Sequence, residues 1–447
     1  MIAGFPAQLS LLTGWLPIVI QLAAALTLVV AVDRRPRRRR LLCAVLAAAV
    51  VVAGAAIGLR LSGSAGEPAP LQLWWWLAAT AAAAVLVLAR WRGVRWWRRV
   101  AKLAAVPACA LCAVLAVNTW TGYLPTVGTA WNQLTSGPLP DEADGTAVSV
   151  LVAHHAMPAT GKVVPLVTGE AVSGFHHREE LVYLPPAWFR SSPPPALPLV
   201  LMIGGEFNTP ADWIRTGNAV TTADAYAARH RGVAPILVFA DPGGAFANDT
   251  ECVNGPRGRA ADHLVAEVVP TAAARFSPAG HPARWGVAGW SMGGTCAVDL
   301  AVMHPEVFSA FVDIAGDVAP NSGTVDQTVA RLFGGDRAAW SAFDPLTVMA
   351  RHGPYHGLAG WFDVNGDVRG HRGDPRVTGD QLDAATVLCG AARARGVDCD
   401  VHTRPGHHDW PFAASAWAAA LPWLTDRLTA SPGPHIVRIA VTAPRGG

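Results

Sequence analysis

Four long apolar runs occupy the first 125 residues of the 447-residue chain. They extend over Leu11–Val32, Leu41–Leu59, Leu71–Leu88 and Leu103–Leu124. A helix of about 17 to 25 apolar residues is long enough to cross the hydrocarbon core of a bilayer. The pattern therefore predicts an all-α transmembrane region of four helices over residues 1–125.

The apolar pattern changes after residue 160, where short β-rich runs alternate with longer helical patterns. The predicted strands are 180–184, 197–203, 235–240, 284–288, 310–314, 360–364 and 400–403. The predicted helices lie near 223–230, 260–275, 293–303, 381–395 and 413–428. This alternation predicts an α/β fold with a mainly parallel central sheet and helices on both of its faces.

Weakly patterned segments surround the predicted α/β domain. Residues 126–160 lack periodicity and contain the turn-forming sequence Gly-Pro-Leu-Pro at 137–140, so we predict a linker there. The α/β domain is expected over residues 161–430, with a cap-like insertion at 318–355. Residues 431–447 form the predicted C-terminal tail.

Charge is distributed unevenly along the chain. Residues 1–125 hold thirteen basic and two acidic residues, whereas the rest holds 22 basic and 30 acidic residues. The basic residues of the first part gather at 34–40 and 90–102, and the positive-inside rule places these loops in the cytoplasm. We therefore predict a multi-pass protein of the plasma membrane with an extracytoplasmic C-terminal domain. Lysine accounts for only two of the 35 basic residues, and the composition gives no support for nucleic-acid binding.

The sequence Gly-Trp-Ser-Met-Gly-Gly at 289–294 follows a predicted strand and begins a predicted helix. This G-x-S-x-G pattern is typical of a nucleophile elbow, in which Ser291 occupies a strained turn above the sheet. Small neighbours such as Gly289 and Gly293 leave room for the backbone to fold back. A glycine-rich turn without chemistry is the alternative, but the place of the motif within the alternating domain favours a catalytic serine.

A catalytic serine needs a base and a carboxylate that orients the base. His408 lies between the last predicted strand and the last predicted helix, and it is our candidate base. Asp367 follows the 360–364 strand and is the candidate acid, with Asp374 and Asp380 as alternatives. A metal site at residues 407–409 is a second interpretation, but no further ligand cluster accompanies them. The predicted chemistry needs no cofactor.

The oxyanion of a tetrahedral intermediate needs two preorganised hydrogen-bond donors. One candidate is the backbone N–H of Met292, at the start of the helix that follows the serine. The other is the backbone N–H of Glu206, in the Gly-Gly-Glu turn after the strand that ends at Ile203. A tight turn without catalytic function is the alternative interpretation of this glycine pair.

The region from Lys162 to Leu428 resembles the Putative esterase family of α/β-hydrolases, which includes the antigen 85 mycolyltransferases and esterase D. The resemblance rests on the early strand at 178–185, the elbow at 289–294 and the histidine loop at 406–410. It implies an α/β-hydrolase fold with a Ser–His–acid triad. Members usually end the oxyanion strand with His-Gly or Asp-Gly, where this chain has Gly204-Gly205.

Cysteines are found in both parts of the chain. Cys43, Cys109 and Cys112 lie in the apolar runs, which leaves four cysteines in a compartment that permits disulfides. Among three possible connectivities we favour Cys252 with Cys296 and Cys389 with Cys399. Four buried free thiols are the alternative.

These observations predict a membrane-anchored extracytoplasmic serine esterase or acyltransferase that works through an acyl-enzyme. Its expected partners are the membrane and a lipid or other acyl-ester substrate, such as an ester of the cell envelope. A catalytically silent hydrolase fold, used as a binding or scaffold module of the envelope, is the alternative function. The three occupied triad positions argue against that alternative.

Overall fold

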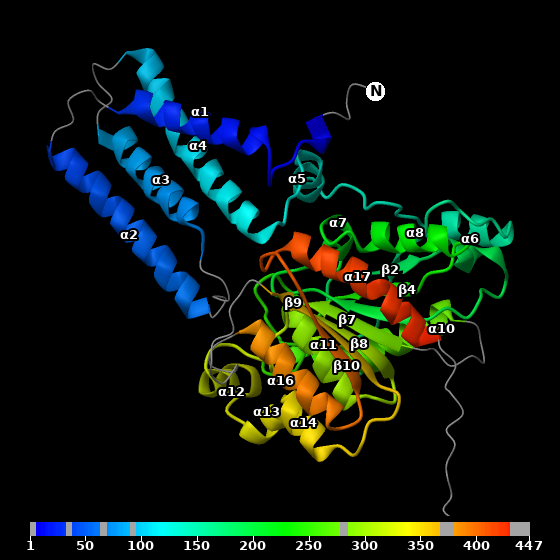
Figure 1. Cartoon of the computed structure of the whole chain (residues 1–447). Helices are drawn as coiled ribbons and strands as arrows, with labels where there is room; N and C mark the ends of the chain where they lie inside the picture. Colours follow the sequence, from blue (N-terminus) through cyan, green and yellow to red (C-terminus); the bar gives the residue numbers. More distant parts are fainter. Residues whose placement is uncertain are drawn as a thin grey trace, which may run out of the picture.

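The computed structural model describes residues 6–32, 38–62, 69–89, 95–277, 285–366 and 380–429. The chain forms an N-terminal group of helices followed by an α/β domain (Figure 1). After the short 3-10 helix η1 (Pro6–Gln8), the N-terminal helices are α1 (Trp15–Ala31), α2 (Arg38–Ser62), α3 (Leu71–Ala89) and α4 (Trp96–Thr121). Their order along the chain matches the four predicted apolar runs.

The N-terminal helices pack against one another through small side chains. Helix α4 contacts α1 and α3, and α3 also contacts α2. Ala31, Ala83 and Ala105 are buried together where α1, α3 and α4 meet, and such small residues let helices approach closely. Helices α2, α3 and α4 are long and apolar enough to cross a membrane, whereas α1 has 17 residues and is shorter. The predicted count of four spans therefore stays a prediction.

An eight-stranded sheet forms the centre of the α/β domain, in the order β1-β2-β4-β3-β7-β8-β9-β10. Strands β1 and β2 pair antiparallel, β2 pairs antiparallel with β4, and the remaining pairs are parallel. The strands are β1 (Lys162–Leu166), β2 (Glu180–Leu184), β3 (Leu199–Ile203), β4 (Ile236–Ala240), β7 (Trp285–Trp290), β8 (Phe308–Ile314), β9 (Ala359–Asn365) and β10 (Asp398–Arg404). The predicted mainly parallel α/β sheet is confirmed.

Helices cover both faces of the sheet (Figure 1). One face carries α8 (Ala219–Arg229) and α17 (Trp410–Thr429), whose apolar sides share a core with Trp213 and Trp290. The other carries α11 (Met292–Met303) and α16 (Gln381–Arg393), whose core includes both disulfides. The remaining elements are η2 (Pro186–Arg190), α7 (Asp212–Arg215), β5 (Asn254–Gly255), β6 (Gly258–Arg259), α9 (Ala260–Asp262), the π-helix η3 (His263–Val268) and α10 (Val269–Phe276).

The insertion between β8 and β9 is helical. It contains α12 (Val325–Phe333), α13 (Arg337–Phe343) and α14 (Pro345–Arg351). Thr324 and Gln327 form a capping box that starts α12, and the Asp344 carboxylate accepts the Thr347 N–H at the start of α14. These local caps explain why a segment without a clear sheet signal folds into short helices.

The segment predicted as a linker contains two helices, α5 (Val127–Leu134) and α6 (Gly145–Ala153). Just before it, the Tyr123 hydroxyl donates to Asp212 Oδ1 at 2.7 Å, and the Thr216 hydroxyl donates to the Tyr123 carbonyl at 3.0 Å. Gly122 lies so close to Pro411 that a side chain there would overlap the proline ring. The end of α4 is therefore packed directly on the α/β domain.

Two disulfides link elements of the α/β domain. They join Cys252 to Cys296 and Cys389 to Cys399, with Cα–Cα distances of 5.7 and 5.9 Å. Both predicted pairings are confirmed. The first fastens the loop after β4 to α11, and the second connects the end of α16 to the start of β10.

Candidate active site

Ser291 occupies the turn between β7 and α11 with a backbone φ of 58°. This left-handed conformation is rare for a residue with a side chain, and it raises the hydroxyl above the end of the sheet. A Cβ at Gly289 would overlap the carbonyl group of Gly293, and one at Gly293 would overlap the Ile203 carbonyl oxygen. The two glycines of the sequence motif are therefore required by the turn itself.

His408 lies in the loop between β10 and α17, and its Nε2 is 2.9 Å from Ser291 Oγ. The ring of Trp290 packs against the imidazole with a centroid distance of 4.2 Å. Burial in this apolar contact lowers the pKa of His408 to about 4. The imidazole is therefore neutral at physiological pH, which is the state that can accept a proton. The neighbouring His407 is exposed.

The other ring nitrogen of His408 contacts an amide. Gln381 Nε2 lies 2.8 Å from His408 Nδ1 and also donates to the Ala315 carbonyl at 3.0 Å. Sequence reasoning did not identify Gln381, because a glutamine at the start of a helix carries no catalytic signal. The amide lies at the nitrogen where a triad places its carboxylate.

The candidate acids have different positions. Asp367 and the alternative Asp374 lie outside the described residues. The third candidate, Asp380, accepts the N–H groups of Leu382 and Asp383 and begins α16. Asp363, at the end of β9, is fully buried and forms a two-bond ion pair with the guanidinium of Arg404. The metal interpretation of 407–409 gains no support, since Asp409 accepts the Phe412 N–H and His408 faces the serine.

The predicted oxyanion donors belong to the start of α11 and to the turn after β3. The Met292 N–H belongs to the first turn of α11, where backbone donors have no acceptor within the helix. Gly205, which precedes Glu206, packs on the elbow so closely that a Cβ there would lie 3.1 Å from the Ser291 Cβ. The Gly204-Gly205 pair thus permits the turn after β3 to approach the serine.

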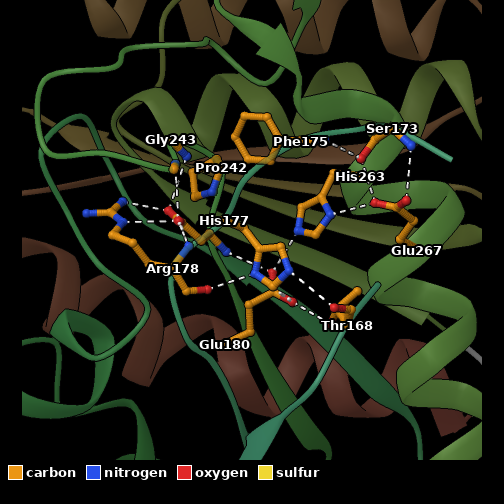
Figure 2. Close-up of polar contacts among 12 residues, drawn as sticks. Thr168, Ser173, Phe175, His177, Arg178, Glu180, Pro242, Gly243, His263 and Glu267 are labelled. Atoms are coloured by element: carbon orange, nitrogen blue, oxygen red, sulfur yellow. Dashed lines mark hydrogen bonds and ion pairs between the residues drawn. The ribbon is translucent and has the colours of Figure 1, made fainter. Parts of the chain in front are cut away.

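A salt bridge of Arg178 is connected to this turn through Asn208, and Figure 2 shows Arg178 with its polar contacts. The Arg178 guanidinium donates to both carboxylate oxygens of Asp241, at 2.5 and 3.0 Å, and to the Asn208 carbonyl at 2.7 Å. The Asn208 side chain in turn accepts the Gly205 N–H at 2.9 Å. Arg178 therefore connects the ends of β2 and β4 to the predicted oxyanion turn.

A buried histidine network adjoins this salt bridge (Figure 2). Fully buried His263 has Glu267 Oε2 at 2.9 Å from one ring nitrogen and Glu180 Oε1 at 3.1 Å from the other. Hydrogen bonds and charge attraction from both carboxylates raise the pKa of His263 against the effect of burial. The ligand-type atoms of His177, Glu180 and His263 lie within 4.8 Å of one another, a spacing compatible with a metal ion.

The geometry of the network favours hydrogen bonding over metal binding. The rings of His177 and His263 stack with centroids 4.5 Å apart and planes 24° apart, so their in-plane lone pairs run side by side and do not converge. His177 Nδ1 also lies 2.8 Å from the Arg178 carbonyl, which requires a proton on that nitrogen. We therefore interpret the network as an imidazolium held between two carboxylates.

The fold and the site together define a class of protein. An eight-stranded α/β sheet that carries a strained serine elbow, with a neutral histidine 2.9 Å from the serine, defines a serine ester hydrolase of the α/β-hydrolase type. The chain belongs to the Putative esterase family, whose family model matches residues 176–425. The resemblance found in the sequence is thereby confirmed.

Individual relatives are more distant. The chain is 29% identical over 271 residues to an uncharacterized protein of Corynebacterium glutamicum, and the match covers 59% of this chain and 61% of that protein. It is also similar to a solved ferulic acid esterase, with 21% identity, a TM-score of 0.46, and 60% and 99% of the two chains covered. An S-formylglutathione hydrolase from Agrobacterium tumefaciens gives 19% identity, a TM-score of 0.47, and 61% and 97% coverage.

Proposed function

We propose that this protein is a membrane-anchored extracytoplasmic serine esterase or acyltransferase that acts on ester bonds of cell-envelope lipids. The observation that carries the proposal is the 2.9 Å contact between Ser291 Oγ and His408 Nε2 at the elbow. The catalytic roles follow from this contact, and the membrane assignment follows from the N-terminal helices and from the way α4 joins the domain.

In the proposed mechanism, Ser291 Oγ attacks the ester carbonyl carbon while His408 Nε2 takes the hydroxyl proton. The backbone N–H groups of Met292 and Glu206 stabilise the oxyanion. The ester C–O bond then breaks, and His408 returns the proton to the departing alcohol oxygen. Water or an acceptor alcohol then attacks the acyl carbon while His408 takes its proton. The bond between the acyl carbon and Ser291 Oγ breaks, and His408 returns the proton to the serine oxygen.

We assign the carboxylate that orients His408 to Asp367, with Asp374 and Asp380 as alternatives. A triad base needs a proton on Nδ1 so that Nε2 can accept one from serine. Gln381 contacts this end of the imidazole, since its Nε2 lies 2.8 Å from His408 Nδ1 while it donates to the Ala315 carbonyl at 3.0 Å. Loss of turnover in Asp367→Asn, with Asp374→Asn and Asp380→Asn as comparisons, identifies the acid.

A lipid substrate is supported by how the α/β domain meets the N-terminal helices. The end of α4 is held by the Tyr123 bonds to the α7 segment and contacts Pro411, three residues after His408. If the apolar helices span the bilayer, the active site lies near the outer leaflet. Phe207 and Phe246 are 39% and 69% exposed, with ring centroids 5.2 Å apart, beside the predicted oxyanion turn. Such aromatic side chains suit contact with the apolar chains of a lipid.

An extracytoplasmic position is supported by chemistry as well as by charge. The disulfides Cys252–Cys296 and Cys389–Cys399 form and persist in oxidising compartments. The uneven distribution of basic residues gives the same orientation. Both observations support an extracytoplasmic position of the domain.

Labelling of the purified full-length protein with a fluorophosphonate tests the catalytic part of the proposal. Wild-type protein is expected to be labelled, and Ser291→Ala to lose labelling and about 10⁴ to 10⁶ of its turnover while keeping its fold. An unlabelled wild type would favour the silent binding module. Turnover of lipid esters in vesicles, compared with short soluble esters, tests the substrate class, and a preference for the soluble esters would contradict it.

A further inference from the structure

Four acidic residues gather beside the elbow, and none of them has a role in the mechanism above through its side chain. Glu206 follows β3, Asp249 and Glu251 lie in the loop after β4, and Asp317 follows β8. We call Glu206, Asp249, Glu251 and Asp317 the acidic cluster. Their negative charges repel one another. The Asp249 charge raises the pKa values of both Glu206 and Glu251, and the Asp317 charge raises the pKa of Glu251.

Short contacts fix the acidic cluster next to Ser291. Glu206 directly follows Gly205, the residue packed on the serine. The Asp317 N–H donates to the Thr295 hydroxyl at 2.9 Å, and Thr295 lies in the first turn of α11. The loop that holds Glu251 is tied to the following residue of α11 by the Cys252–Cys296 disulfide. The cluster therefore borders the start of the helix that carries the nucleophile.

The acidic cluster has more negative than positive groups. Arg257 is the guanidinium that the described contacts place there, and its Nη1 donates to Asp249 Oδ2 at 3.1 Å. Its Nη2 donates to the Ser322 hydroxyl at 3.3 Å, and its charge partly offsets the rise in the pKa of Glu206. The Asn321 amide donates to Asp317 Oδ2 at 2.5 Å. Burial and repulsion raise the pKa of Glu206 to about 7, and burial raises that of Asp317 to about 6. An additional positive group would relieve this repulsion.

Glu251 provides a buried oxygen that such a positive group could contact. Its side chain is 6% exposed, and its Oε2 is buried without a hydrogen-bond partner in the part of the chain that the structure describes. A buried carboxyl oxygen without a hydrogen-bond partner costs free energy, and burial together with the Asp249 and Asp317 charges raises the pKa of Glu251. A bound ligand that donates hydrogen bonds and carries positive charge would remove both costs.

The position of the acidic cluster relative to His408 indicates which part of an ester it meets. Cys252 and Cys296 beside the cluster belong to the core on the α11 face of the sheet. Trp290 and Trp410, which flank His408, belong to the core on the α17 face. The departing alcohol must face His408, because the histidine protonates it. The cluster on the opposite face therefore borders the acyl part.

We propose that the acidic cluster binds a primary ammonium group in the acyl part of the substrate, close to the scissile carbonyl. The inference rests on the proposed esterase function and specifies its substrate class as esters of amino acids. An ammonium offers three N–H donors and one positive charge. These donors suit the unpartnered Glu251 Oε2 together with the carboxylates of Asp317 and Glu206.

The test compares two esters that differ only in this charge. Dodecyl alaninate and dodecyl lactate have acyl groups of the same size, and lactate carries a hydroxyl where alanine carries its ammonium. Full-length protein is assayed with each ester in phosphatidylcholine vesicles, at a pH where the amine is protonated. We expect kcat/KM for alaninate to exceed that for lactate by about 10- to 100-fold, as for hydrogen bonds between charged groups.

Substitutions in the acidic cluster test whether these residues produce the preference for alaninate over lactate. Asp317→Asn and Glu251→Gln are expected to reduce the alaninate-to-lactate ratio about 10-fold or more. Asp326→Asn, an equivalent change at an exposed aspartate on α12, is the control and should keep the wild-type ratio. A variant that is damaged as a whole loses both rates together, and an unchanged ratio would overturn the proposal.

The outcomes separate this inference from the proposed function. Equal kcat/KM for the two esters in a wild-type protein that hydrolyses both would overturn the ammonium site and leave the esterase intact. Failure to hydrolyse either ester, together with no fluorophosphonate labelling, would overturn the esterase function itself. Loss of the preference on addition of EDTA would also overturn the proposal, because it would assign the cluster to a metal ion.

Discussion

At the scale of single residues, the surroundings of Ser291 and His408 determine their chemistry. The serine hydroxyl is exposed at the elbow because Gly289 and Gly293 permit the backbone φ of 58°. Burial lowers the pKa of His408 and keeps its imidazole neutral, and Trp290, the residue before the serine, packs on the ring. One short motif therefore supplies both the nucleophile and part of the environment of its base.

The two adjacent histidines of the loop should differ sharply in importance. His408→Ala removes the proton acceptor at 2.9 Å from Ser291, so turnover should fall by about 10⁴ or more. His407→Ala changes an exposed side chain and should have a mild effect. Steady-state kinetics of both variants decide the matter, and the reverse ranking would show that the wrong imidazole was chosen.

The pH dependence of activity should report the lowered pKa of His408. Only the neutral imidazole accepts the serine proton, so kcat/KM should fall as the pH drops below the pKa of about 4. If the histidine had its ordinary pKa, kcat/KM would instead fall near pH 6.5. A profile of kcat/KM between pH 3.5 and 8 measures this limb, and a midpoint near 6.5 would contradict the assigned environment.

At the scale of elements, buried polar contacts hold together parts of the sheet that are distant in sequence. Glu180 begins β2, His263 and Glu267 lie in the π-helix η3, and Arg178 bonds Asp241 after β4. π-Helical segments are rare and are frequently found at special sites. Here the wider turn of the π-helix brings both His263 and Glu267 into the interior, next to the salt bridge between Arg178 and Asp241.

The buried network should make stability depend on pH in a defined window. The raised pKa of His263 contributes stability below about pH 6.5, which is lost as pH rises through the folded-state pKa. Hydrogen bonds from Ser173 and His263 hold the pKa of Glu267 at about 2, so its contribution is present above about pH 4.5 and is lost as pH falls. The network should therefore stabilise most between these limits.

His263→Gln tests this window. Removing one partner of a buried ionic network should cost about 3 to 5 kcal/mol. The loss should be largest near pH 5.5 and smaller at pH 9, as measured by the thermal midpoint of unfolding at each pH. An equal loss at both pH values would show that packing, not charge, explains the effect.

At the scale of the whole molecule, the α/β domain is joined firmly to the helix before it. Tyr123 bonds Asp212 and Thr216, and Arg215 donates to the Gly137 carbonyl after α5. A flexible tether would allow the active site to move relative to the bilayer, whereas these contacts hold it to the end of α4. If the apolar helices span a bilayer, as we propose, their orientation determines which leaflet the site meets.

Reporter fusions or cysteine accessibility at two positions test the predicted topology. Gly137 lies after α4 and Arg38 begins α2, so the positive-inside rule places them on opposite sides of the membrane. We expect an extracytoplasmic signal at Gly137 and a cytoplasmic one at Arg38. A cytoplasmic signal at Gly137 would overturn the proposed localisation.

The sequence alone determined the features that depend on neighbouring residues. Apolar periodicity predicted seven strands of the sheet within a few residues, and the elbow motif located Ser291, because a strand, a tight turn and a helix are adjacent in the chain. It missed β1, whose five residues include Pro165 and which is stabilised by antiparallel pairing with β2. Strand propensity gives a weak signal for such an edge strand.

Only the tertiary structure decided which distant side chains meet. Gln381 reaches His408 across 27 residues, and His263 reaches Glu180 across 83. Tyr123 reaches Asp212 across 89 residues and holds the end of α4 on the α/β domain. These contacts follow from the order of strands in the sheet and from helix packing on its faces. No local pattern encodes that order, because it results from the burial of all the apolar faces at once.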